Sequence, residues 1–178
     1  MPSEQKIRHF LKQRKSLFLN TLFFVAVFIG VSAFQARNML PKSDLTAPAL
    51  IGPLLRGGSY DIAAAGERPI LVYFFAPWCK YCAVSSDNLT RLRRLRDDDS
   101  LEILTVALDW RDRDEVSSYV DRHDLDLPVV LGDSKIAQDW RVYGFPTYYV
   151  LGSDRRIRHR DFGYSTQLGL WWRTWFVD

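Results

Sequence analysis

The sequence contains little cysteine and little histidine. Its 178 residues include only two cysteines, Cys79 and Cys82, and three histidines, His9, His123 and His159. A tetrahedral zinc site needs four ligands, usually cysteines and histidines. No second Cys-x-x-Cys and no His pair is available to complete such a set. We therefore expect no metal centre of this kind.

Charged residues are absent from residues 16–34, SLFLNTLFFVAVFIGVSAF. Nineteen residues of helix are about long enough to cross the roughly 30 Å hydrocarbon core of a bilayer. Five of the six basic residues within positions 1–37 precede this stretch, and Glu4 is the only acidic residue there. Because basic flanks stay on the cytoplasmic side, we expect one membrane span, a cytoplasmic N-terminus and an exported domain.

A cleaved signal peptide is the alternative, since the residues VSA at 31–33 resemble a weak cleavage site. We favour an uncleaved anchor because the apolar run exceeds the ~7–15 residues of a usual signal core. The rest of the chain is exported in either case. A buried helix of a globular core explains the one-sided basic flank least well.

Beyond residue 37 the chain has no marked excess of either charge, because it carries 18 of the 24 basic and 20 of the 21 acidic residues. We therefore expect no nucleic-acid partner. With 47% apolar and 25% charged residues, the chain favours a packed core and one globular domain. We predict a cytoplasmic basic segment at 1–15, a transmembrane helix at 16–34, a tether at 35–47 and the domain at 48–178.

The domain alternates predicted strands and helices, which is typical of an α/β fold with a central mixed sheet and helices on both faces. The apolar run PILVYFF leads directly to the cysteines, and a helix follows them. The predicted strands lie at 69–75, 101–108, 127–131, 147–152 and 156–163; the predicted helices run from Cys82 to about Asp97, at 112–123, at 135–144 and from Ser165, which is placed to cap the last one.

A Cys-x-x-Cys pair at the first turn of a helix is suited to thiol–disulfide exchange. The unpaired N–H groups and the dipole of the helix favour a thiolate on Cys79, and Lys80 adds a nearby cation. Cys79 is therefore the predicted nucleophile, and Cys82 the predicted resolving thiol that breaks the mixed disulfide. Tyr81 shields the pair without adding charge.

Two other uses of the cysteines remain open. A static disulfide is compatible with an exported domain, but so short a loop removes little entropy from the unfolded chain. A copper-binding or copper-tolerance module is a different class of protein, because two thiolates alone can coordinate Cu(I). Retention of stoichiometric copper by the purified domain distinguishes it.

The sequence around the cysteines resembles the thioredoxin superfamily. Trp78-Cys79-Lys80-Tyr81-Cys82 follows an apolar strand, and Gly144-Phe145-Pro146-Thr147 leads into a later one. The resemblance spans roughly residues 48–177 and implies a thioredoxin-like fold without a bound cofactor. It also implies that Pro146 is cis, that Phe145, Pro146 and Thr147 line a substrate groove, and that Trp78 shapes access to the Cys79 sulfur.

The anchor and the extra elements between Cys82 and Pro146 resemble the TlpA and ResA group of membrane-tethered envelope thioredoxins, in particular the suppressor-for-copper-sensitivity protein D type. This implies a bacterial inner-membrane protein with a periplasmic domain. Its implied partners are envelope proteins with cysteines or disulfides and an inner-membrane redox partner. A dedicated apocytochrome c reductant is the alternative within the same chemistry.

Two positions depart from the family pattern. Tyr73 stands where thioredoxin has a buried aspartate, and Ser85 stands where the cytochrome-maturation reductants have a glutamate. No acid that takes the Cys82 proton is identifiable from the sequence, which puts transfer of the reductant role in doubt. For Trp171, Trp172 and Trp175 we predict core or membrane-near packing, and for the RLRRLR run at 91–96 a solvated helix face.

Overall fold

The computed structural model describes residues 18–27, 29–31, 37–41 and 46–177, and the chain divides into two compact units, residues 1–37 and 38–178. Residues 18–27 and 29–31 are helical, and their large apolar side chains are exposed. No helix in the described ranges is both long and apolar enough to cross a bilayer. The predicted span 16–34 lies partly outside those ranges, at residues 16, 17, 28 and 32–34.

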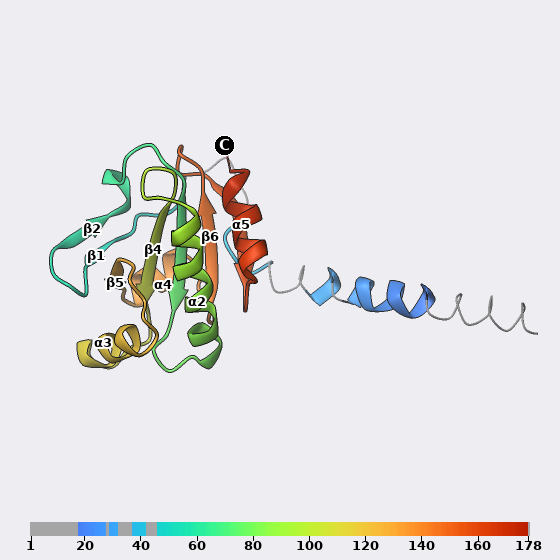
Figure 1. The fold of residues 1–178 in the computed structure, drawn as a ribbon, viewed down its shortest axis with the longest axis horizontal. Helices are drawn as coiled ribbons and strands as arrows, with labels where there is room; N and C mark the ends of the chain where they lie inside the picture. The colour runs from blue at the N-terminus through green and yellow to red at the C-terminus, as the bar shows by residue number, and fades with distance from the viewer. Residues whose placement is uncertain (1–17, 28, 32–36, 42–45, 178) are drawn as a thin grey trace, which may run out of the picture. The chain divides into compact units, whose positions relative to one another are not determined.

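The second unit is built around a five-stranded mixed sheet (Figure 1). Its strand order is β5-β4-β3-β6-β7, with β3, β4 and β5 parallel and with β6 antiparallel to both neighbours. The strands are β3 (Ile70–Phe75), β4 (Glu102–Ala107), β5 (Val129–Leu131), β6 (Thr147–Leu151) and β7 (Ile157–Phe162). The apolar run predicted as a central strand is β3, and all six of its residues are buried.

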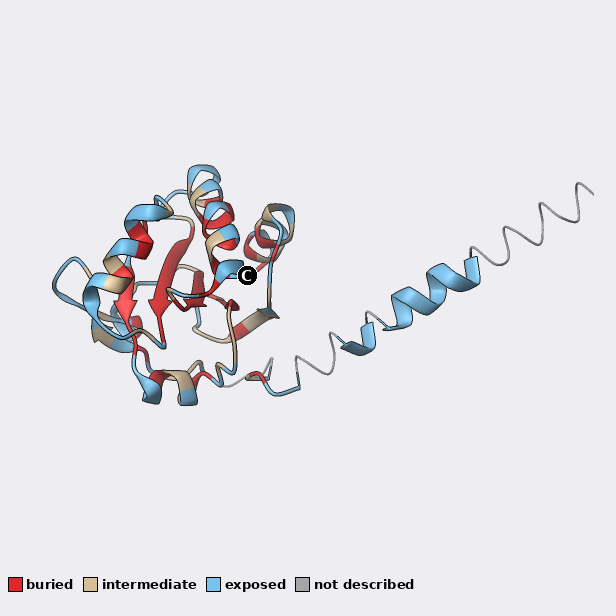
Figure 2. Cartoon of the chain, turned by 90° about the horizontal axis from the view of Figure 1, so that it is seen from below, coloured by how far each residue is buried: buried red, intermediate tan, exposed pale blue. Residues whose placement is uncertain are grey.

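Helices cover both faces of this sheet, which confirms the predicted α/β class. Side chains of β3 alternate between two core clusters, with Tyr73 on one face and Phe74 on the other. The first cluster packs against α2 (Lys80–Leu95), α3 (Arg113–Arg122) and α5 (Gln167–Trp175), and the second against α4 (Ser134–Asp139). Figure 1 shows α2 and α5 side by side, and Figure 2 shows the buried strands between the helices.

The structure differs from the sequence-based elements in three places. A hairpin of β1 (Ile51–Pro53) and β2 (Ser59–Asp61), with a short 3-10 helix η1 (Ile62–Ala64), precedes β3 and was not predicted. Helix α4 ends at Asp139, five residues before the predicted end at residue 144, because Arg141 adopts a left-handed backbone with φ of 50°. The cap of α5 is Thr166, whose Oγ1 accepts a hydrogen bond from Gly169 N, and not Ser165.

The compact domain also takes in part of the predicted tether 35–47. Met39 is buried in the second core cluster, and the backbone N–H of Leu40 donates to the Tyr149 hydroxyl at 3.2 Å. Residues 42–45 lie outside the described ranges. The apolar side chain of Met39 is the reason for the difference, since its burial in the core stabilises the packed arrangement of this segment.

Candidate active site

Strand β3 and helix α2 place the two cysteines at the first turn of the helix. Cys79 is the N-cap of α2, and its Sγ accepts a hydrogen bond from the backbone N–H of Cys82 at 3.2 Å. The two residues form a disulfide, with their Cα atoms 5.2 Å apart. Cys79 is 6% exposed and Cys82 is fully buried, so Cys79 is the sulfur that a partner reaches first.

The same geometry favours a thiolate on Cys79 when the disulfide is reduced. A backbone N–H at a helix start is one of the four that have no partner within the helix, and here it points at the Cys79 sulfur. The helix dipole adds partial positive charge at this end. Lys80 and Tyr81, the two residues between the cysteines, are both exposed.

Trp78 is fixed beside the pair by the loop after β4. Its indole Nε1 donates to both the backbone oxygen and the Oδ2 of Asp109, each at 3.1 Å. Asp109 has a φ of 52°, which is a left-handed conformation that few non-glycine residues adopt. The Trp78 ring meets the Phe145 ring edge-on at 5.9 Å. These contacts hold an exposed aromatic side chain between the cysteines and the Phe145 loop.

The Phe145–Pro146 peptide bond is cis, as the resemblance implies. Pro146 O accepts a hydrogen bond from Gly163 N at 2.8 Å, and Thr147 Oγ1 donates to Gly144 O at 2.8 Å. Phe145 packs against the core cluster that contains both cysteines. The loop is thus held by backbone and side-chain hydrogen bonds, with Phe145 in contact with Trp78, the residue before Cys79.

Behind Cys82 lies a buried network of hydroxyl groups. Tyr73 Oη donates to Cys82 O at 3.1 Å, and Ser86 Oγ donates to the same oxygen at 3.0 Å. Ser86 Oγ is also 2.8 Å from Tyr119 Oη. A serine hydroxyl has one proton to give, so Tyr119 donates to Ser86. The Cys82 backbone is therefore tied from two sides by neutral groups.

The hydroxyl network stays uncharged over the working pH range. Burial raises the pKa of Tyr119 to about 12 and that of Tyr73 well above its ordinary value. Among the described residues the only buried carboxylate is Glu102, at the start of β4, where it pairs with Arg68 at 2.9 Å. The cysteines follow the other end of the parallel strand β3, so this carboxylate does not lie beside Cys82.

A family model described as thioredoxin-like matches residues 66–157, which is more than half of the chain and includes the cysteines, Phe145 and Pro146. The chain belongs to the thioredoxin-like family. The match, together with the cysteine pair, makes it a disulfide oxidoreductase of thioredoxin type.

Curated relatives are similar over most of the chain. A thioredoxin-like protein of Haemophilus influenzae is 26% identical over 97% of this chain and 98% of its own length. A thiol:disulfide interchange protein DsbE of Allochromatium vinosum is 29% identical over 77% of this chain and 76% of its own. The solved structure of a Chlorobium tepidum thiol:disulfide interchange protein has a TM-score of 0.69, at 15% identity over 78% of this chain and 99% of that one. The last likeness concerns the fold alone.

The thioredoxin-like fold brings most of the predicted site residues together. Cys79 and Cys82 belong to one core cluster against which Phe145 packs, and Phe145 also contacts Trp78, whereas Lys80 and Tyr81 are exposed. Sequence reasoning missed the residues that hold this group, namely Asp109, Ser86 and Tyr119. Each belongs to an ordinary helix or loop pattern, and no sequence motif marks its contact with the cysteines.

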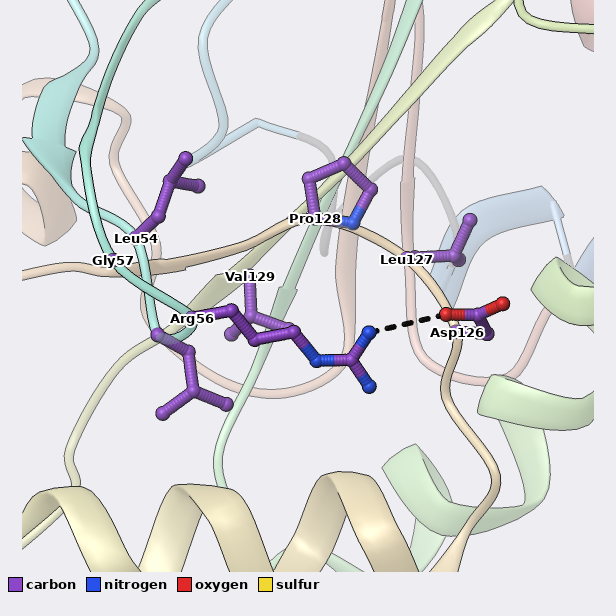
Figure 3. Close-up of a pocket in the computed structure, with 8 residues that line it drawn as sticks. Leu54, Arg56, Gly57, Asp126, Leu127, Pro128 and Val129 are labelled. Carbon is purple, nitrogen blue, oxygen red and sulfur yellow. Dashed lines mark hydrogen bonds and ion pairs between the residues drawn. The ribbon is translucent and has the colours of Figure 1, made fainter.

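Two hollows on the domain surface differ in their relation to this site. One, of about 480 Å³, borders Phe145 and is also lined by Asp109, Trp110 and Tyr143. The other, of about 280 Å³, lies between Leu54–Gly57 and Asp126–Val129, where Arg56 and Asp126 approach to 3.2 Å (Figure 3). That ion pair is largely exposed and contributes little to stability, and no predicted site residue lines the hollow.

Within the described ranges, no group of three or more His, Cys, Asp or Glu side chains is arranged to hold a metal ion. The two histidines in the described ranges, His123 and His159, do not join the cysteines in any such group. His123 instead stacks on Tyr119 at 4.6 Å.

Proposed function

We propose that this protein exchanges disulfides with envelope proteins through Cys79 and Cys82, from a position tethered to the bacterial inner membrane. The observation that carries the proposal is the hydrogen bond from the Cys82 N–H to the Cys79 sulfur at the start of α2. It favours a thiolate on the more exposed of the two cysteines. The more buried Cys82 is left to resolve the intermediate.

Exchange proceeds in two steps that conserve atoms and electrons. The Cys79 thiolate attacks one sulfur of a client disulfide, the client S–S bond breaks, and one client thiolate leaves. Cys82 then loses its proton and attacks the Cys79 sulfur, which releases the second client thiolate and forms the Cys79–Cys82 disulfide. The client is reduced and the protein oxidised; the reverse sequence oxidises the client.

The tether is supported by the N-terminal sequence and by side-chain exposure. Residues 16–34 contain no charge, and five basic residues precede them. In the described helical pieces, Phe18, Phe23 and Phe24 are each more than 60% exposed. A lipid environment covers such side chains without protein contacts. The anchor places the domain in the periplasm by the charge rule and raises its local concentration near an inner-membrane redox partner.

Trapping with single-cysteine variants tests the assignment of roles. In the full chain Cys82→Ser should accumulate mixed disulfides between Cys79 and client proteins, because the resolving thiol is gone. Cys79→Ser is the matched control and should trap almost none, since Cys82 is fully buried. Diagonal gel electrophoresis under non-reducing and then reducing conditions reads out both. Equal trapping by the two variants, or none by Cys82→Ser, would sink the assignment.

A further inference from the structure

Helix α5 has apolar side chains on both of its faces. Leu170 is buried toward the sheet, and Trp171 is half-buried against the same core. The opposite face carries an exposed stripe at spacings of three and four residues, which is one side of a helix. This stripe consists of Leu168, Trp172, Trp175 and Phe176, each more than half exposed.

Three of the four side chains in the stripe are aromatic, and each of them contacts another ring. The Trp172 and Phe176 rings are 4.6 Å apart, and Trp175 stacks on Trp171 at 5.3 Å. The Arg96 guanidinium lies over the Trp175 ring at 5.0 Å and donates to Thr174 O at 3.0 Å, which ties the end of α5 to α2. Trp175 is therefore held on the surface by its contacts with Arg96 and Trp171.

The first residues of the domain lie beside the strand on which α5 is fastened. On the edge strand β7, Arg160 donates to the backbone oxygens of Met39, at 3.3 Å, and Leu40, at 2.6 Å. The next residue, Asp161, pairs with Arg173 of α5 at 2.9 Å. The segment that leads into the domain and the aromatic helix thus flank the same edge of the sheet.

Only residues 35–37 separate the end of the uncharged stretch from the start of the compact domain. Three extended residues reach at most about 11 Å. If residues 16–34 span a bilayer, the β7 edge is held near its surface. Tryptophan is the residue most suited to that layer, because its ring is largely apolar and its N–H stays near water.

We propose that the exposed face of α5, centred on Leu168 and Trp172, rests in the headgroup layer of the bilayer that anchors the chain; the proposal rests on the proposed anchor. The occupant is the lipid surface, because a short tether holds this edge of the domain at it. Docking fixes the orientation of the domain relative to the membrane. It thereby also fixes the orientation of the cysteines, which follow the carboxyl end of β3.

Quenching of tryptophan fluorescence by brominated acyl chains tests the proposal. The full chain is reconstituted in vesicles of phosphatidylcholine and phosphatidylglycerol, with and without bromine. We expect the tryptophan fluorescence of the wild type to be quenched. Leu168→Glu removes an apolar contact but no tryptophan, so its equilibrium constant for docking should fall about tenfold or more and its quenching should fall with it. A glutamate in the first turn of α5 suits the helix dipole. Ile51→Glu, 60% exposed on β1 near the opposite sheet edge, is the matched control and should be quenched like the wild type.

The outcomes separate the two proposals. A chain that floats with the vesicles without quenching overturns the docking of α5 and leaves the anchor standing. A chain that does not float overturns the anchor and the docking with it, while disulfide trapping by Cys82→Ser is unaffected. Quenching that Leu168→Glu leaves unchanged, or a dimer in cross-linking that depends on Leu168, also contradicts a lipid contact at this face.

Discussion

Cys82 is the residue whose surroundings set the pH dependence of exchange. Its backbone oxygen receives hydrogen bonds from Tyr73 and Ser86, and the only buried carboxylate among the described residues is at the far end of β4. Burial raises the pKa values of Tyr73 and Tyr119, so both hydroxyls hold their protons near neutral pH. These groups position Cys82 but do not take its proton.

The resolving step should therefore follow the ionisation of Cys82 itself. When reduced protein reacts with oxidised glutathione, the closure of the Cys79–glutathione mixed disulfide should accelerate about tenfold per pH unit across the neutral range, because the thiolate form of Cys82 is the nucleophile. Acid quenching and mass spectrometry measure the step. A plateau already reached below neutral pH would contradict this view, since it requires a base of low pKa.

Tyr73→Phe is the control for that pH profile. The variant keeps the ring contacts with Phe75 and Tyr148, at 5.9 and 5.0 Å, and loses only the hydroxyl that donates to Cys82 O. If Tyr73 only positions the cysteine, the slope with pH stays the same while the rate changes. A flattened slope would instead identify Tyr73 as the proton acceptor.

At the scale of elements, α5 depends on a single side-chain cap. Thr166 Oγ1 accepts the Gly169 N–H at 3.2 Å, and the neighbouring Ser165 Oγ accepts from Arg173 instead. We expect Thr166→Ala to lower the free energy of unfolding by about 1 kcal/mol, the usual contribution of such a cap. Urea denaturation measures it, with Thr166→Ser as the control that retains the oxygen. An unchanged midpoint for Thr166→Ala would mean that the cap contributes nothing.

Elements with strong periodicity could be predicted from sequence, and elements defined by tertiary contacts could not. The uninterrupted apolar run gave β3, and the helical spacing after Cys82 gave α2. The strands of the β1–β2 hairpin are three residues each and include Gly52 and Pro53, so they carry no alternation to detect. The early end of α4 depends on one left-handed residue, Arg141, which no local pattern marks.

The RLRRLR run shows the same limit. Arg91 and Arg94 are exposed, as the predicted solvated face requires. Arg93 instead donates to Leu101 O at 3.0 Å, and Arg96 donates to Ser100 O at 2.8 Å and to Thr174 O. Arg93 and Arg96 connect the end of α2 to the following loop, and Arg96 also connects it to α5. The partners are backbone oxygens, and the sequence carries no information about which of them lie within reach.

At the scale of the molecule, the cysteines and the cis-proline loop could be placed from sequence because both belong to short motifs. The residues that hold the site in place could not be predicted from sequence, since Tyr119 lies 33 residues from its partner Ser86, and Asp109 lies 31 residues from its partner Trp78. The domain was predicted to begin at residue 48, whereas the compact unit begins at Asn38. The sequence does not indicate this earlier start, because the burial of Met39 depends on a core assembled from distant strands.

Equilibration of the full chain with glutathione buffers tests the central claim, a reversible Cys79–Cys82 redox couple, most directly. Acid trapping and mass spectrometry give the fraction of the dithiol form at each potential. We predict one two-electron transition between about −270 mV, where the protein is a reductant, and about −120 mV, where it is an oxidant. A disulfide that resists reduction until below about −300 mV would be a static one, and the exchange function would be contradicted.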